Sequence, residues 1–189
     1  YFDKVSFCQS GKSFSYEYNG LGNITSVTDS NGNKTVYKYE GGNAYNVTEI
    51  ENQNGKTYNV SYDSANNVTS ESTEHYGVSY SRNSMGQIDS TLIADKDNPN
   101  NRMITSSTYY LSPALSSYSK VNTSTDERGN VTTYLYDDFG RLKGTYLNND
   151  EGILYTYNAY GQILSSALAK YNASSGELES LTTTEIGDI

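Results

Sequence analysis

Aromatic and polar side chains alternate along much of this chain. Phe14, Tyr16 and Tyr18 are two residues apart, and small or charged residues stand between them. A β-strand turns successive side chains to opposite faces, so these three rings share one face. The same spacing returns in residues 35–39 and 132–136. The pattern therefore predicts a series of short β-strands that each carry aromatic rings on one face.

Tight-turn signals separate these stretches. In "YNGLGNI" from Tyr18 and "YDDFGRL" from Tyr136, an Asn or Asp stands three residues before a glycine. The Asn or Asp side chain can cap the amides of a turn, and glycine adopts a positive φ without steric cost, as we expect of Gly140. Asn-Gly pairs at residues 31–32 and 54–55 are further hairpin signals. Because every connection is short, neighbouring strands must be antiparallel.

These elements recur as one repeated unit, G-x-x-x-x-Y-x-Y-[N/D]-x-x-G-x-I. We call its second tyrosine position the anchor. The anchors, which mostly recur every 20 to 23 residues, are Tyr18, Tyr39, Tyr62, Arg82, Tyr136 and Tyr157. The long interval after Arg82 leaves room for one degenerate copy in residues 106–130. We therefore expect residues 1–189 to be a single repeat domain of about seven units of roughly 21 residues, cut from a longer chain.

The predicted fold class is an all-β antiparallel meander of about a dozen short strands. Open twisted sheets seldom exceed about ten strands without curling, so we expect a strongly curved sheet. Two places depart from regular strands. Ile24 and Val27 are three residues apart, which indicates either a β-bulge, the interpretation we favour, or partial burial of both faces. In residues 163–181, Leu164, Ala167, Leu168 and Tyr171 follow helical spacing and predict one short helix.

Composition changes the expected core. Hydrophobic residues make up 34% of the chain, and the aromatic residues are 20 Tyr, 4 Phe and no Trp. A tyrosine buries a large ring while its hydroxyl stays at the rim. A tyrosine-lined sheet, partly buried on both sides, therefore fits better than a core of Leu, Ile and Val.

Charge and cysteine content exclude several classes of function. The formal net charge of −9 argues against nucleic acid, whose phosphates need a basic surface. Cys8 is the only cysteine, so the chain has neither a disulfide framework nor a thiolate metal site. No apolar run approaches 18 residues, so no membrane span is expected.

Two acidic stretches look superficially like calcium loops. Residues 94–101 offer Asp95, Asp97, Asn98 and Asn100 as oxygen ligands, but they lack the central Gly and closing Glu of an EF-hand loop. The simpler interpretation is a polar insertion between strands. Residues 29–34 are better explained as a hairpin turn. We therefore predict no metal and no cofactor.

Asn-x-Ser/Thr sequences occur at Asn23, Asn46, Asn59, Asn67, Asn130 and Asn172. In a secreted eukaryotic protein these would be glycan acceptors. The interpretation we favour is that they mark the junction between turn and strand in a bacterial repeat.

No catalytic residues are predicted, and we expect the protein not to be an enzyme. His75 is the only histidine and has no Cys, Ser or Asp partner in a recognisable motif. The acidic pair Asp137 and Asp138 fits turn capping better than acid–base chemistry.

Tandem "YDxxGRL" units, with "DxxGNxTxYxYD" between them, resemble the RHS or YD-repeat family. This family includes bacterial polymorphic-toxin proteins, insecticidal toxin-complex subunits and animal teneurins. The resemblance extends from about residue 11 to about residue 165, and residues 124–145 are a near-consensus copy. Other copies are eroded, since Arg82 replaces Tyr, Asn66 replaces Gly and residues 94–105 are an insertion.

The resemblance implies a β-ribbon that spirals into a hollow shell, often around a toxic or unfolded C-terminal passenger. The family's self-cleaving, aspartate-based core has no counterpart here. Pro99 and Pro113 follow Asn and Ser, so there is no Asp-Pro site.

Two functions remain open. The first is a structural segment in the wall of a toxin-delivery shell, secreted or at the bacterial cell surface. Its partners would be the rest of its own chain and, through raw edge strands, further copies. We expect an open wall and no sealed container. The alternative is a carbohydrate-binding or adhesion module that uses the tyrosine faces, for which a glycan would be the partner.

Overall fold

β-strands joined by turns and loops are the secondary structure of the described part of the chain. The computed structural model describes residues 4–9, 11–39 and 45–185. The strands are β1 (Lys4–Gln9), β2 (Lys12–Tyr18), β3 (Ile24–Thr28), β4 (Lys34–Tyr39), β5 (Val47–Glu51), β6 (Thr57–Tyr62), β7 (Val68–Ser72), β8 (Tyr76–Arg82), β9 (Ile88–Asp95), β10 (Arg102–Tyr109), β11 (Val121–Thr125), β12 (Val131–Tyr136), β13 (Leu142–Leu147), β14 (Glu151–Tyr157), β15 (Ile163–Asn172) and β16 (Glu177–Glu185). Within these ranges there is no helix long and apolar enough to cross a membrane.

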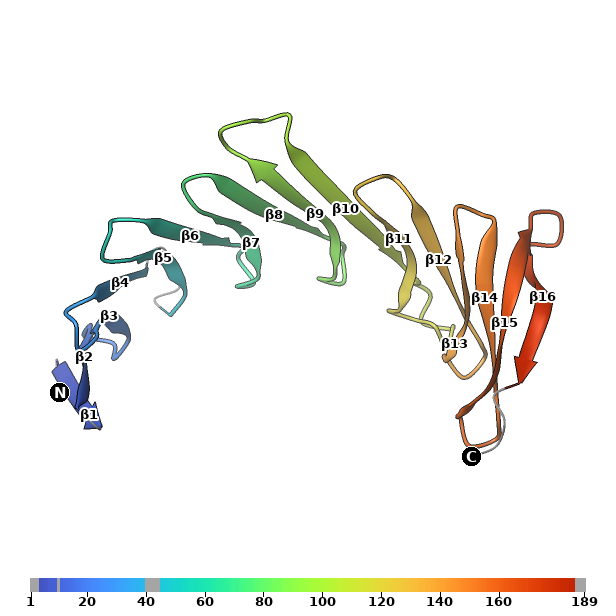
Figure 1. Cartoon of the computed structure of the whole chain (residues 1–189), viewed down its shortest axis with the longest axis horizontal. Coiled ribbons are helices and arrows are strands. Elements are labelled where there is room, and N and C mark those ends of the chain that lie inside the picture. The colour runs from blue at the N-terminus through green and yellow to red at the C-terminus, as the bar shows by residue number, and fades with distance from the viewer. Residues whose placement is uncertain (1–3, 10, 40–44, 186–189) are drawn as a thin grey trace. The chain divides into compact units, whose positions relative to one another are not determined.

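The strands follow one another in the sheet in the order in which they occur in the chain (Figure 1). Each pairs antiparallel with its neighbours, as the registers of β1 to β8 and of β10 to β16 show. β1 and β16 stand at the two ends of this order and the sheet does not close. The predicted antiparallel meander is therefore confirmed, with sixteen described strands in place of about a dozen.

Two compact units can be described separately. The first comprises residues 1–81 and 91–103, and the second comprises residues 82–90 and 104–189. The single domain of seven units and the strong curvature stay predictions.

Most turns share one geometry, and the cap residue creates it. At Asn19, Oδ1 accepts hydrogen bonds from the amides of Leu21 and Asn23, both at 3.0 Å, and the amide of Gly22 donates to the carbonyl of Asn19. The same cap recurs at Asp29, Asn52, Asp63, Asn83, Asp126, Asp137 and Asn158. The Asn/Asp-x-x-Gly turns and the turns with an Asn-Gly pair therefore have the same geometry. Each is a type I turn followed by a residue with a positive φ.

The left-handed position is what requires glycine. Gly140 has a φ of 74°, as predicted, and Asn66 takes the position at 65° in the unit where glycine is missing. Asparagine is the commonest substitute there because its short polar side chain tolerates this region. In the Asn31-Gly32 pair only the glycine has a positive φ, so the turn is not the two-residue type that the pair often forms.

A β-bulge follows the turn in each of six hairpins. Tyr18 pairs with Ile24 and Glu17 pairs with Ser26, so Thr25 has no opposite residue. Because directly opposed residues share a face, Ile24 and Val27 both lie on the face of the tyrosines. The bulge that we favoured is therefore confirmed. The equivalent extra residues are Thr48, Thr69, Asn122, Lys143 and Leu164.

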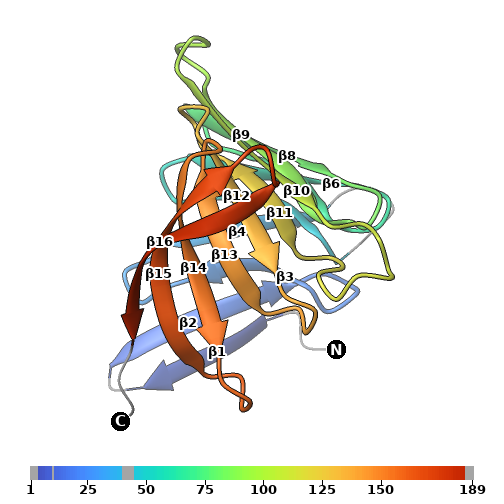
Figure 2. The same cartoon turned by 90° about the vertical axis from the view of Figure 1, so that its right-hand side faces the viewer.

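The short helix predicted in residues 163–181 is wrong. These residues form β15 and the start of β16, and β15 lies between β14 and β16 in the sheet (Figure 2). The buried residues of β15 are Ser165, Ala167 and Ala169, which have a period of two, whereas Leu164 and Leu168 are exposed. Pairing along both edges of β15 therefore outweighs the helical spacing of its larger apolar residues.

The buried core is small and lies mainly in the second unit. Tyr146 and the two alanines of β15 are the buried apolar residues there, and Ser26 is the buried residue of the first unit. Elsewhere the strand residues are mostly half-buried. A tyrosine-lined sheet without an aliphatic core, as the composition indicated, therefore describes both units.

The two glycine turns at residues 137–140 and 158–161 provide a matched stability test. Gly140→Ala and Gly161→Ala both force a side chain to a positive φ, which costs about 1–2 kcal/mol. The Cβ at position 140 also lies 2.6 Å from the carbonyl oxygen of Ser116, whereas the position at 161 is open. We expect Gly140→Ala to lower the free energy of unfolding more, as measured by urea denaturation. Equal losses would contradict the close approach of Ser116.

The aspartate caps should make the fold acid-sensitive. The amides of Asn33 and Asn130 hold the pKa of Asp29 and of Asp126 below the usual value. A carboxylate with a lowered pKa stabilises the fold above its unfolded pKa of about 3.9, and this contribution is lost as the pH falls through the folded pKa. Asn serves as the cap elsewhere, so the double variant Asp29→Asn/Asp126→Asn should keep its turns.

We expect the thermal midpoint of the native chain to fall more steeply below about pH 4 than that of the double variant. Asp138→Asn is the control, since this exposed carboxylate makes no hydrogen bond within the described structure. The idea fails if the double variant and the native chain show the same acid dependence.

Candidate functional site

The anchor tyrosines join consecutive units. The hydroxyl of Tyr39 donates to the carbonyl of Ile24 at 2.8 Å, and that of Tyr62 donates to Val47 at 2.9 Å. Tyr157 bonds Leu142 in the same way at 2.7 Å. Each acceptor is the first strand residue after the turn of a neighbouring hairpin. We call these contacts the tyrosine rungs.

The rung forms where the regular ladder has stopped. The pairing between β3 and β4 includes Ser26 opposite Val36 but does not reach Ile24. Tyr39 lies at the end of β4, and its hydroxyl reaches the carbonyl of Ile24. The backbone of β4 does not pair with this carbonyl. One tyrosine therefore supplies both cross-strand packing and a hydrogen-bond donor.

The degenerate copy predicted in residues 106–130 keeps the rung and the bulge. Tyr109 donates to the carbonyl of Ile88 at 2.6 Å and pairs with Val121 across a bulge. Its turn is replaced by residues 110–120. The amide of Tyr110 donates to the carbonyl of Lys120, and the amide of Ser119 donates to the carbonyl of Tyr110, so the ends of this loop are joined. An insertion has therefore lengthened the turn without altering the strand register.

This inserted loop packs on the next hairpin. The ring of Tyr110 meets that of Tyr136 edge to face, with centroids 5.8 Å apart, and its hydroxyl donates to the carbonyl of Tyr134. Burial raises the pKa of both Tyr110 and Tyr136. Their hydroxyls therefore stay protonated, and that of Tyr110 stays a donor, throughout the physiological pH range.

A second aromatic contact depends on a glycine in the neighbouring strand. The rings of Tyr146 and Tyr171 stack with centroids 4.5 Å apart. Gly152 stands opposite Tyr146 in the register, and a Cβ there would lie 2.8 Å from the Cβ of Tyr146. The glycine thus leaves β13 and β14 close together at the most buried part of the second unit.

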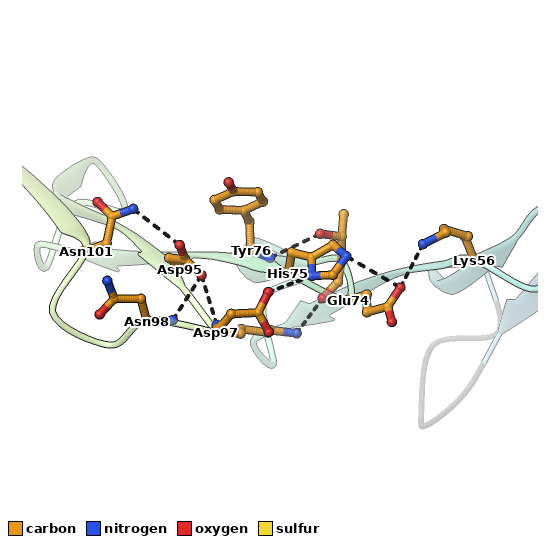
Figure 3. A network of polar contacts seen from close by, with 10 residues as sticks. Lys56, Glu74, His75, Tyr76, Asp95, Asp97, Asn98 and Asn101 are labelled. Atoms are coloured by element: carbon orange, nitrogen blue, oxygen red, sulfur yellow. Dashed lines mark hydrogen bonds and ion pairs between the residues drawn. The ribbon is translucent and has the colours of Figure 1, made fainter.

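The loop at residues 94–101, which we predicted to be a polar insertion between strands, is held by hydrogen bonds of its own residues and contacts the turn between β7 and β8 (Figure 3). The carboxylate of Asp95 accepts hydrogen bonds from the amides of Asp97 and Asn98 and from the side chain of Asn101. Its oxygens are therefore engaged by their own loop. No group of three or more His, Cys, Asp or Glu residues suited to a metal ion occurs in the described part of the chain.

The same loop reaches the turn between β7 and β8. His75 Nδ1 lies 2.7 Å from Asp97 Oδ2, and His75 Nε2 lies 3.7 Å from Glu74 (Figure 3). Lys96 donates from its amide to the carbonyl of His75 and from its Nζ to that of Thr73. Sequence reasoning missed this pairing because His75 and Asp97 are 22 residues apart and meet only through the meander.

This histidine–carboxylate contact is exposed and serves to attach the loop. The side chains of His75 and Asp97 are 53% and 69% exposed. Lys56 pairs with Glu74 at 2.9 Å and lowers the pKa of that carboxyl. Lys56, Glu74 and His75 line a shallow hollow of about 300 Å³. No described serine, threonine or cysteine side chain is hydrogen-bonded to the imidazole.

The remaining candidates are turn and junction residues. Asp137 caps its turn and pairs with Arg141, while Asp138 is exposed, so the two carboxylates do not act together. In five of the Asn-x-Ser/Thr sequences the asparagine Nδ2 donates to a nearby side chain; these residues are Asn46, Asn59, Asn67, Asn130 and Asn172. Asn46, Asn67 and Asn130 lie at the junction between turn and strand, as predicted, whereas Asn59 lies inside β6 and Asn172 ends β15.

The sequence matches the RHS Repeat family over residues 8–43. The resemblance to the RHS or YD-repeat family is therefore confirmed. No curated protein matches the sequence.

Solved toxin-complex structures share the fold. A crystal structure of TcdB2-TccC3 without its hypervariable C-terminal region is similar with a TM-score of 0.65 and 14% identity, over 90% of this chain and 10% of that one. TcdB2-TccC3-Cdc42 gives a TM-score of 0.58 and 12% identity, over 96% of this chain and 11% of that one. A Photorhabdus luminescens Tc holotoxin pore gives 0.54 and 13%, over 92% and 10%. At these identities the likeness shows the fold alone, and this chain spans about a tenth of the length of each.

The tyrosine rungs can be tested by removing single hydroxyl oxygens. We expect Tyr157→Phe to lower the free energy of unfolding by about 1 kcal/mol, because it removes the donor to Leu142 and keeps the ring. Tyr160→Phe, three residues away, is the control because its side chain is 91% exposed. Urea denaturation measures both. A Tyr157→Phe variant as stable as Tyr160→Phe would show that the rung adds nothing.

Proposed function

We propose that this chain forms part of the wall of an RHS-type shell, which encloses or presents a C-terminal passenger in a secreted bacterial toxin-delivery protein. The observation that carries the proposal is the tyrosine rung. It recurs at four junctions between hairpins, and at each of them it ties one unit to the unit before it. A repeat array of this kind gains its stability from neighbours, which suits a wall of variable length.

The strand order supports the same role. β1 and β16 each have one partner strand, so both ends of the array offer backbone groups to further strands. The proposed partner at these edges is the rest of a longer chain, and self-association through them is the expected behaviour of the isolated chain. A wall of this kind needs no catalytic residue, metal or cofactor.

The tyrosine faces give less support to the carbohydrate-binding alternative. Tyr39, Tyr62 and Tyr157 donate their hydroxyls to backbone carbonyls, and their rings are half-buried. Rings engaged in this way are poorly placed to stack on a sugar.

Limited proteolysis of the longer protein that contains these repeats tests the wall. We expect its C-terminal segment to resist cleavage while the wall is intact. Gly144→Val should make it sensitive, because a Cβ at this position lies 2.7 Å from the carbonyl of Ile153 and separates β13 from β14. Tyr160→Phe is the matched control in the same unit. If the C-terminal segment is cut equally fast in all three proteins, the wall does not shield it.

A further inference from the structure

Turns of the first unit contain Asn-Gly pairs at residues 19–20, 31–32 and 54–55. In such a pair the backbone nitrogen of the glycine can attack the side-chain amide of the asparagine, because glycine has no side chain to hinder the approach. Asn19 is the cap of its own turn, whereas the other two asparagines stand two residues after the cap. The fold therefore places identical dipeptides in different surroundings.

The glycine nitrogens of these pairs differ in their hydrogen bonds. The amides of Gly32 and Gly55 donate to the carbonyl oxygens of the cap residues at 3.0 and 2.9 Å. Within the described residues, no acceptor bonds the amide of Gly20, which is exposed. An amide must lose its proton to attack a carbonyl carbon, and a hydrogen bond to an acceptor holds that proton. Gly20 therefore supplies the more reactive nitrogen.

The side-chain carbonyl of Asn19 is polarised by its own turn. Its Oδ1 accepts hydrogen bonds from the amides of Leu21 and Asn23, both at 3.0 Å. Attack on Cγ places negative charge on this oxygen, and two fixed amide donors stabilise such an oxyanion. In the described structure Oδ1 of Asn31 and of Asn54 accepts no hydrogen bond. The turn at Asn19 thus holds an activated carbonyl next to an unbonded nucleophile.

Other asparagine caps lack parts of this arrangement. Asn83 and Asn158 each donate Nδ2 to a glutamine side chain, at 3.0 and 2.8 Å, so their leaving nitrogen is held. They are followed by Ser84 and Ala159, whose side chains hinder ring closure. Nδ2 of Asn19 donates to no acceptor among the described residues.

We propose that Asn19 and Gly20 form a self-modifying site, at which the turn converts its own asparagine into aspartate and isoaspartate. The nitrogen of Gly20 bonds to Cγ of Asn19, the bond from Cγ to Nδ2 breaks, and ammonia leaves with the proton of the Gly20 amide. Because both reacting groups belong to one turn, the attack is intramolecular. Water then opens the cyclic imide. Hydrolysis at Cγ gives aspartate, and hydrolysis at the backbone carbonyl gives isoaspartate.

The two products affect the turn differently. An aspartate at position 19 can accept the same two hydrogen bonds, since Asp29 caps its turn in this way. Isoaspartate adds a methylene group to the backbone and shortens the side chain, so it cannot reproduce the cap. The reaction therefore adds a negative charge in either case, but it changes the turn only in the isoaspartate product. This chemistry goes beyond the proposed structural role.

Peptide mapping of the 189-residue chain during storage at mildly alkaline pH tests the proposal. Mass spectrometry with electron-transfer fragmentation follows the loss of each asparagine and distinguishes aspartate from isoaspartate. We expect Asn19 to react at least about five-fold faster than Asn31 and Asn54 in the folded chain, because its turn supplies the oxyanion donors. In guanidinium chloride the three rates should become similar, since the dipeptides are identical.

Gly20→Ala tests the nucleophile. Its methyl group hinders ring closure, so we expect the loss of Asn19 to fall to the rate of Asn31 or below. The turn should be intact, because Gly20 does not have a positive φ and no atom lies within 4 Å of the added Cβ.

Gln53→Gly tests the activated carbonyl at a second turn. Oδ1 of Asn52 already accepts hydrogen bonds from the amides of Asn54 and Lys56, at 2.9 and 3.1 Å. A glycine at position 53 supplies the missing unhindered nitrogen. We therefore expect Asn52, which should be stable in the native chain, to react in this variant at a rate close to that of Asn19.

Three outcomes overturn the proposal. The first is a slower loss of Asn19 in the folded chain than in guanidinium chloride, because the turn would then protect the amide. The second is an equal loss at all three Asn-Gly pairs of the folded chain, and the third is a stable Asn52 in the Gln53→Gly variant. Matched thermal midpoints of the native chain and the variants show that the rates are compared in the same fold.

Discussion

The hydrogen bond from an anchor tyrosine to the carbonyl of the neighbouring hairpin is the interaction on which this architecture depends. Most strand residues are half-buried, and the buried apolar residues are confined mainly to β13 and β15. An aliphatic core therefore cannot be what fixes one hairpin against the next. Backbone pairing joins neighbouring hairpins along most of their length, and the rung adds a directed bond where this pairing stops. The bulge and the capped turn bring the acceptor carbonyl to the right place.

Much of the fold could be predicted from the pattern of residues within one repeat unit. The strands, the antiparallel order and the turn glycines depend on residues within one unit, and the spacing of Ile24 and Val27 even located a bulge. The sequence could not show where each hydroxyl donates, because Tyr39 and Ile24 are 15 residues apart and belong to different hairpins. The helix predicted for residues 163–181 failed for a related reason. Its apolar spacing is local, whereas β15 is held by pairing with strands on both sides.

The candidate site residues also include some that a local pattern predicted and others that only the folded chain brings together. The role of Asp137 as a cap could be predicted from the turn motif, and the insertion at residues 94–101 was correctly interpreted as polar. The contact between His75 and Asp97 could not be predicted, since it needs the insertion to fold back on the preceding turn. The position of Arg141, whose guanidinium lies over the rings of Phe139 and Tyr157, was also missed, because the two rings belong to hairpins that meet only in the folded sheet.

The hydrogen bonds of each capped turn come from the cap residue, the backbone and the left-handed residue. The two residues between cap and glycine contribute only backbone to them, and they vary from Gly20-Leu21 to Ala159-Tyr160 while the turn keeps its form. Each unit therefore carries a short window in which mutation alters the surface without altering the scaffold. Selection, or a combinatorial library, can work on these windows one at a time, so an array of such units can diversify what it displays while inheriting its stability unchanged.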